Sequence, residues 1–348
     1  MLRKLSSCLL IVIALSVMVP ASAQTVIAQL PIPGIVAGSI AVNPLKNEIY
    51  VTSASSSEES NGIISLVDGK TRTVTKTLPL NFDNAGPVLV NPVTQKVYVQ
   101  ACNFLFVANI TCDLLVFDGR LNLLADLPST GVPVAIDPKT GRIYILNENG
   151  LDVMSGVTNQ IIGEINLPGT SSVSLDLFRE RLFAIVNNTE LAVVDLHSNR
   201  IRDRVAIEPG SDQIGVNPIT QRAYITHPNF VTTDSTLLTV LDLNNFRVVA
   251  HVPVTAVPRN VSVDFRANII FVGDDNSLLA IDGEKNRVLT TIERATSAAP
   301  DLASGLVYAT TNLVFFDDSG NSLGQVDVIK EPRRKNAGKG REGKDGGN

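Results

Sequence analysis

Two cysteines stand close enough in the sequence to form a disulfide. Cys102 and Cys112 both lie in the segment QACNFLFVANITCD, whereas the third cysteine, Cys8, lies near the N-terminus. A bridge across so short a loop would contribute about 3 kcal/mol of stability in the loop-entropy account. Disulfides persist in oxidising compartments. We therefore expect a structural Cys102–Cys112 bridge if the chain is exported, with two buried free thiols as the alternative.

Residues suited to acid–base chemistry are sparse and scattered. The chain has three histidines, His197, His227 and His251. His197 falls in an expected turn and His251 in an expected strand, so the sequence predicts no histidine cluster. The HExxH, GxSxG and CxxCH motifs of zinc proteases, serine hydrolases and attached c-type haem do not occur. We therefore assign no catalytic residue.

Two acidic segments resemble short calcium-binding loops, VGDDNS at 272–277 and FDDSGN at 316–321. Neither is followed by the Glu that completes a full calcium loop. We interpret both segments as acidic turns, and we expect no bound metal and no other cofactor.

The first 23 residues have the three-part layout of a secretory signal. A basic start at residues 3–4 precedes an apolar run at 9–19 and the small residues 21–23, which predicts cleavage before Gln24. The apolar run is short for a membrane span, and Cys8 precedes it, whereas lipid attachment would need a cysteine just after it. We expect an exported chain of the periplasm or cell exterior without a membrane span. A retained anchor is the alternative.

Charge is distributed unevenly along the 348 residues, of which 44% are hydrophobic and 18% charged. Residues 331–348 hold six basic and three acidic side chains, which leaves 24–330 with a net charge of −10. An acidic body repels phosphate backbones, so we expect no nucleic-acid partner. The Gly-rich tail lacks apolar residues to bury, so we expect it to be disordered and solvated. Contact with anionic envelope material is the alternative for the tail.

A repeat organises the rest of the chain. An Asn or Asp is followed seven positions later by an aromatic residue in seven places, and the aromatics are on average 43 residues apart. The pairs are Asn43/Tyr50, Asn91/Tyr98, Asp137/Tyr144, Asp176/Phe183, Asn217/Tyr224, Asp264/Phe271 and Asp301/Tyr308. An apolar run ending in Asp follows each aromatic except in the third copy, which has Met154 at that place. The six are Asp68, Asp118, Asp195, Asp242, Asp282 and Asp317.

Each copy is interpreted as four short β-strands, because no copy contains ten residues of helical periodicity. An Asx side chain can accept a hydrogen bond from the backbone two residues on, and a following Pro favours a tight turn. Four strands with a period near 43 residues are typical of propeller blades. The sequence therefore predicts an all-β, seven-bladed β-propeller over residues 24–330. The aromatics should pack between blades, and the Asx and Asp residues should form turns.

The repeat is similar to that of a known family. NPVTQKVYV (91–99), DPKTGRIYI (137–145) and NPITQRAYI (217–225) resemble the repeat of the YVTN family of bacterial exported β-propellers, and EIYVTS (48–53) resembles its name motif. The resemblance covers about residues 25–328. It implies a propeller fold and export, and it leaves the function open. The fourth, sixth and seventh copies depart from the pattern.

Ring closure offers two candidate strands. TVIAQLPIP at 25–33 and NSLGQVDVI at 321–329 both resemble the last strand of a blade. We expect the N-terminal strand to close the ring. The C-terminal strand would then add at the edge or detach.

Candidate binding residues lie on the predicted loops of one face. In a propeller the loops between second and third strands share a face with the connections between blades. Three of these loops are long, at 52–62, 100–113 and 226–236, and insertions on one face of a repeat array often bind partners. Tolerated surface variation is the alternative. The candidates are Phe104, Phe106, His227, Asp83, Asn84, Glu208, Asp212, Gln213, Arg259 and Arg294.

These features favour a non-catalytic binding or scaffold module that engages a protein or another envelope component through the looped face. The alternative is a propeller enzyme, similar to lactonases or streptogramin lyases, with its site at the mouth of the central channel. A histidine at that mouth, beside a carboxylate with a raised pKa, would favour the enzyme.

Overall fold

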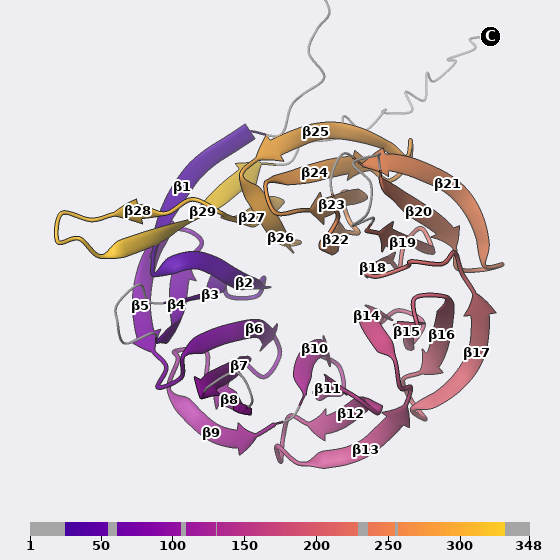
Figure 1. The fold of residues 1–348 in the computed structure, drawn as a ribbon, viewed down its shortest axis with the longest axis horizontal. Helices are drawn as coiled ribbons and strands as arrows, with labels where there is room; N and C mark the ends of the chain where they lie inside the picture. Colours follow the sequence, from indigo (N-terminus) through magenta and orange to yellow (C-terminus); the bar gives the residue numbers. More distant parts are fainter. Residues whose placement is uncertain are drawn as a thin grey trace, which may run out of the picture.

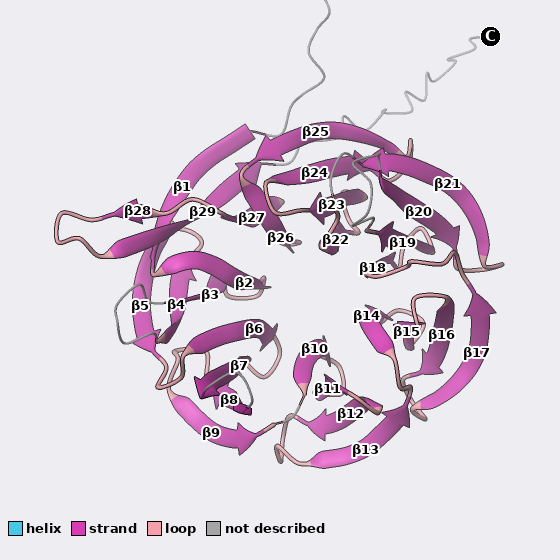
Figure 2. Cartoon of the chain, viewed as in Figure 1, coloured by secondary structure: helices cyan, strands magenta, loops and turns pink. Residues whose placement is uncertain are grey.

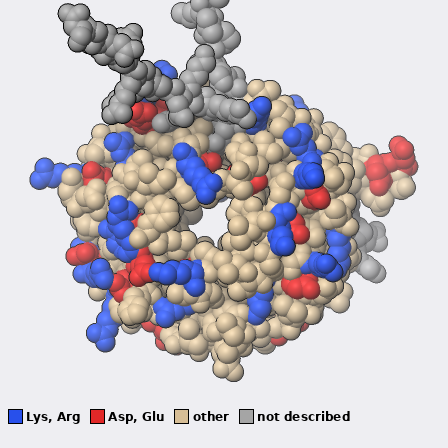
Figure 3. Space-filling model, turned by 180° about the vertical axis from the view of Figure 1, so that it is seen from behind, with Lys and Arg blue, Asp and Glu red and all other residues tan. Residues whose placement is uncertain are grey.

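The computed structural model describes residues 25–54, 61–105, 109–129, 131–228, 236–254 and 257–330. These residues form β-strands and loops without a helix (Figure 2), and hence without a helix that could cross a membrane. Their strands build seven antiparallel sheets arranged in a ring (Figure 1), and a central channel stays open when the side chains are drawn (Figure 3). The predicted seven-bladed β-propeller is confirmed.

Six blades are continuous in sequence, and each runs from an inner to an outer strand. Blade one is β2 (Ile35–Asn43), β3 (Glu48–Ala54), β4 (Gly62–Asp68) and β5 (Thr73–Pro79), and blade two is β6 (Asn84–Asn91), β7 (Lys96–Leu105), β8 (Asn109–Phe117) and β9 (Leu123–Pro128). Blade three is β10 (Val132–Asp137), β11 (Arg142–Asn147), β12 (Gly150–Ser155) and β13 (Ile161–Asn166).

The next three blades have the same order. Blade four is β14 (Thr170–Asp176), β15 (Arg181–Val186), β16 (Glu190–Asp195) and β17 (Arg200–Ala206), and blade five is β18 (Ile214–Asn217), β19 (Arg222–His227), β20 (Thr236–Asp242) and β21 (Arg247–Val254). Blade six is β22 (Asn260–Asp264), β23 (Ile269–Gly273), β24 (Ser277–Asp282) and β25 (Arg287–Glu293).

Blade seven joins the two ends of the described chain. Its strands, from the channel outwards, are β26 (Ala295–Asp301), β27 (Leu306–Thr311), β29 (Ser322–Lys330) and β1 (Thr25–Pro33). The N-terminal strand therefore closes the ring, as predicted. The prediction for the C-terminal strand was wrong, because β29 is the third strand, paired with both β27 and β1. The run that ends at Asp317 contributes the two-residue strand β28 (Phe315–Phe316), in a hairpin that projects from the ring (Figure 1).

The repeated polar residues form turns. All seven Asx residues are buried, and each side-chain oxygen accepts a hydrogen bond from the backbone N–H two residues on, at 2.8 to 3.2 Å. Asp68, Asp118, Asp242 and Asp282 cap the turn after the third strand in the same way, whereas Asp195 accepts from the N–H of Ser198, three residues on. In blade three the equivalent position is Ser155 and not Met154, since Ser155 pairs with Arg142 and its hydroxyl accepts from the Val157 N–H.

The repeated aromatics pack between blades, and all seven are fully buried. Tyr50 donates a hydrogen bond from its hydroxyl to the carbonyl of Gly119 in the next blade, at 2.9 Å. In blade six, Gly283 occupies the position of Gly119. A methyl group on Gly283 would lie only 2.8 Å from the hydroxyl of Tyr224 in blade five. The glycine after the third strand thus makes room for the tyrosine of the preceding blade at these interfaces. Leucine takes the place of the glycine at two others, as Leu196 near Tyr144 and Leu243 near Phe183.

Candidate functional site

The hairpin of β7 and β8 extends beyond the second and third strands of the other blades. β7 has ten residues and β8 has nine, whereas β11 and β12 have six each. The added rungs pair Cys102 with Cys112 and Phe104 with Ile110. A disulfide joins Cys102 to Cys112 across the two strands, with their Cα atoms 4.1 Å apart. The predicted bridge is confirmed, and it ties together the two strands of the extension.

Hydrogen bonds attach the base of this hairpin to the loop before blade two. The backbone N–H of Phe104 donates to the Asp83 carboxylate at 2.6 Å, and the N–H of Asp83 donates to the Asn103 side chain at 3.1 Å. Asn84 lies opposite Cys102 in the pairing of β6 with β7. The structure therefore brings together three predicted residues, Asp83, Asn84 and Phe104. Phe106 lies outside the described residues, as do 55–60 and 229–235 of the other long loops.

The described part of the extension presents an apolar pair. The side chains of Phe104 and Ile110 are 51% and 62% exposed, and the two residues lie directly opposite each other. Exposed apolar residues held on a rigid element are typical of binding surfaces, because little conformational entropy is lost when they are covered. This extension is the strongest candidate for a binding surface on the looped face.

A second candidate is a cluster of acid–base side chains in blade five. Glu208, from the loop between β17 and β18, has its Oε1 2.8 Å from His251 Nε2 and its Oε2 3.6 Å from His227 Nε2. The Thr239 hydroxyl donates to Glu208 Oε2 at 2.6 Å. The prediction that the histidines form no cluster was therefore wrong. Because Thr239 and His251 are opposite each other in β20 and β21, the register of the strands places His251 beside Glu208.

The cluster borders a cavity of about 290 Å³ between blades four and five. The cavity lies towards the outer strands and not at the channel mouth, where an enzyme site was expected. Its wall is mainly apolar, with Ser211 and the cluster residues at the polar end. The apolar lining residues are Ala206, Ile207, Ile225, Leu241, Phe246 and Val248.

The environment sets the protonation of this cluster. Burial raises the pKa of Glu208, but hydrogen bonds from Thr239 and His251 outweigh burial, so the pKa of this carboxyl lies below its usual value. Burial lowers the pKa of His227, whose side chain is 15% exposed. At neutral pH we therefore expect Glu208 to be ionised and His227 to be neutral.

Acidification from neutral pH to about pH 5 should lower the free energy of unfolding through His227. The pKa of His227 is below 6.5 in the folded chain and close to 6.5 when unfolded. Between these values the unfolded chain binds a proton that the folded chain does not, so stability falls as the pH falls. Urea denaturation across this range should show a shallower pH dependence in His227→Gln. An unchanged slope in this variant would contradict the prediction.

The other predicted residues lie apart from these two sites. Asp212 and Gln213 pair with Thr226 through their backbone N–H groups, at 2.9 and 3.0 Å. Arg259 forms an ion pair with Asp275 on blade six. Arg294 is held by backbone hydrogen bonds at the start of blade seven. The structure therefore does not gather all the predicted residues into one site.

The two acidic segments form turns. Asp274 accepts hydrogen bonds from the backbone N–H groups of Asn276 and Ser277, and Asp317 accepts from Ser319 and Asn321. Within the part of the chain that the structure describes, no group of three or more His, Cys, Asp or Glu side chains is arranged to hold a metal ion.

Comparison with known proteins finds no family model and no curated protein that matches this chain.

Proposed function

We propose that this chain is an exported β-propeller that acts as a non-catalytic binding or scaffold module. The observation that carries the proposal is the exposed Phe104–Ile110 pair on the disulfide-linked extension of β7 and β8. An exposed aromatic on a rigid support is the kind of residue that dominates the energy of protein interfaces. The partner is a protein or another envelope component with an apolar pocket for this pair.

Export and family belong to the same proposal. The N-terminal segment with its signal-like layout and the disulfide both support an oxidising compartment outside the cytoplasm. The repeats NPVTQKVYV and EIYVTS support membership of the YVTN family of bacterial exported propellers.

Replacing the apolar pair should abolish capture of the partner. In a pull-down from cell-envelope extract, wild-type chain should retain one partner that the Phe104→Ser, Ile110→Ser double variant loses. Truncating a central interface aromatic typically costs about 2 kcal/mol or more, which corresponds to a loss of affinity of about thirtyfold.

The matched control is Leu123→Ser, which removes a comparably exposed apolar side chain from β9 and leaves the extension intact. This variant should retain the partner. Equal capture by all three chains, or no capture by wild type, would overturn the proposal. The cavity beside Glu208 and His227 would then be the site to screen with lactone substrates, with His227→Gln as the inactive reference.

A further inference from the structure

Seven equivalent turns surround the channel on the face opposite the β7–β8 extension. Each joins the first and second strands of a blade, and in each the Asx side chain holds the N–H of the residue two positions later. The same hydrogen bond therefore presents one side chain at the same place in every blade. We call these seven residues the turn crown: Leu45, Val93, Lys139, Phe178, Ile219, Arg266 and Ala303.

Four of the seven crown residues are large and apolar. Leu45, Val93, Phe178 and Ile219 are between 55% and 67% exposed. The turn requires only the backbone N–H at this position. Side chains as different as those of Lys139, Arg266 and Ala303 occupy the same position in other blades, so the turn does not require an apolar side chain there. Apart from the ring of Phe178, which contacts Phe265, no packing between blades is shown for these exposed apolar side chains in the described residues, and several such residues on one face indicate an interaction site.

The turns that carry the crown are also basic. Their eight cationic residues, counted with the adjoining strand ends, are Lys46, Lys96, Lys139, Arg142, Arg179, Arg181, Arg222 and Arg266. Six acidic residues lie in the same segments, but four of them are the buried Asx carboxylates. Figure 3 looks onto this face and shows Lys and Arg side chains around the open channel.

The opposite face has the reverse charge. Apart from the projecting β28–β29 hairpin, the described loops and strand ends there hold eight acidic residues, against the two basic residues Arg259 and Arg294. The acidic residues are Asp83, Glu148, Glu190, Glu208, Asp212, Asp274, Asp275 and Glu293. The turns after the third strands share the crown face and add seven basic and six acidic residues, so the described crown face still holds more basic than acidic residues. The field of the molecule would therefore orient this face towards an anionic surface.

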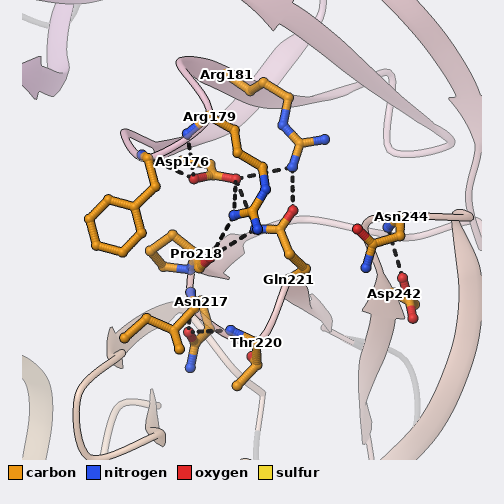
Figure 4. A network of polar contacts seen from close by, with 11 residues as sticks. Asp176, Arg179, Arg181, Asn217, Pro218, Thr220, Gln221, Asp242 and Asn244 are labelled. Atoms are coloured by element: carbon orange, nitrogen blue, oxygen red, sulfur yellow. Dashed lines mark hydrogen bonds and ion pairs between the residues drawn. The ribbon is translucent and has the colours of Figure 1, made fainter.

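Buried contacts fix the crown where it is most apolar. The Asp176 carboxylate accepts hydrogen bonds from Arg181 at 3.0 Å and from Gln221 at 2.9 Å, and Arg179 donates to the carbonyl of Pro218 at 2.8 Å (Figure 4). These contacts join the turns that carry Phe178 and Ile219. The ring of Phe178 also packs edge to face against Phe265, with the centroids 5.9 Å apart. The apolar tips are therefore held in position before anything covers them.

We propose that the crown face docks on the surface of an anionic lipid bilayer. The apolar tips would enter the interfacial region, and the surrounding Lys and Arg side chains would contact lipid phosphates. Shallow apolar insertion together with basic residues is what interfacial membrane binding requires. A nucleic acid would use the cations but not the ring of apolar tips. Docked in this way, the propeller would direct the β7–β8 extension away from the membrane.

Vesicle flotation with the purified exported chain tests this proposal. The chain should float with vesicles of phosphatidylcholine and phosphatidylglycerol, should not float with phosphatidylcholine alone, and should be released by salt. Phe178→Ser with Ile219→Ser should abolish flotation. Arg266→Glu should weaken binding by more than about fivefold, the effect expected for one basic residue near an anionic surface.

Two controls separate the crown from other sources of binding. Phe104→Ser with Ile110→Ser, on the opposite face, should leave flotation unchanged, so this test is independent of the proposed function. A chain ending at Lys330, which lacks the basic tail, should still float. The proposal would be overturned if the chain ending at Lys330 no longer floated, or if the crown variants floated as well as wild type. Binding to DNA without binding to vesicles would overturn it as well.

Discussion

Ile32→Asp should destabilise the whole ring, because this residue lies in the strand that joins the two ends of the propeller. Ile32 of β1 is fully buried in an apolar cluster with Ile49 and Val51 of blade one and Val326 and Val328 of β29. An unpaired carboxylate at this place would cost about 4 kcal/mol or more. That is a large part of the roughly 5–15 kcal/mol that stabilises a typical domain.

Urea denaturation and limited proteolysis would measure this effect. The matched control is Val26→Asp, near the other end of the same strand, where the side chain is 37% exposed. It should change the free energy of unfolding by about 0.5 kcal/mol or less. Equally small effects for both variants would mean that β1 does not close the ring in solution.

The fold could be predicted because its signals are local and repeated. An Asx residue and an aromatic seven positions later recur in every blade. The Asx residue forms the turn between the first and second strands, and the aromatic fills the interface between neighbouring blades. The seventh blade was predicted less well because LVFFD (313–317) has the pattern of a third strand. Only pairing distinguishes it from β29, whose neighbours β27 and β1 are separated by nearly the whole chain. A pattern within one segment carries no information on such partners.

The sites were harder to predict, because they depend on which residues the strand register places together. Phe104 and Asp83 were candidates on separate loops, and the pairing of β6 with β7 brings them into contact. His251 was missed because it was assigned to the interior of a strand. Counting back from the pair Asp242–Arg247 would place Ala250 opposite Thr239, and only the bulge between Val240 and Leu241 brings His251 to that position. The crown was missed as well, because Leu45 and its counterparts belong to the repeat and carry no unusual motif.

Asp176→Asn should destabilise the ring by about 3 kcal/mol, as expected when one partner of a buried ion pair is removed. One carboxylate oxygen of Asp176 accepts from the backbone N–H groups of Phe178 and Arg179, and the other accepts from Arg181 and Gln221. Asn can keep the first role, since Asn43, Asn91 and Asn217 form the same turn in other blades. Asn cannot replace the second carboxylate oxygen, because Arg181, whose side chain is largely buried, would lose its anionic partner.

Asp264→Asn is the matched control, since it makes the same change in blade six. Asp264 accepts from the N–H groups of Arg266 and Ala267, and the described residues show no ion pair for it. Its replacement should cost about 1 kcal/mol or less, the difference between a charged and a neutral acceptor. Urea denaturation of both variants separates the turn from the ion pair. If both variants lose the same free energy of unfolding, the carboxylate stabilises the ring only through the turn. If only Asp176→Asn loses stability, the carboxylate acts through the contact between blades four and five.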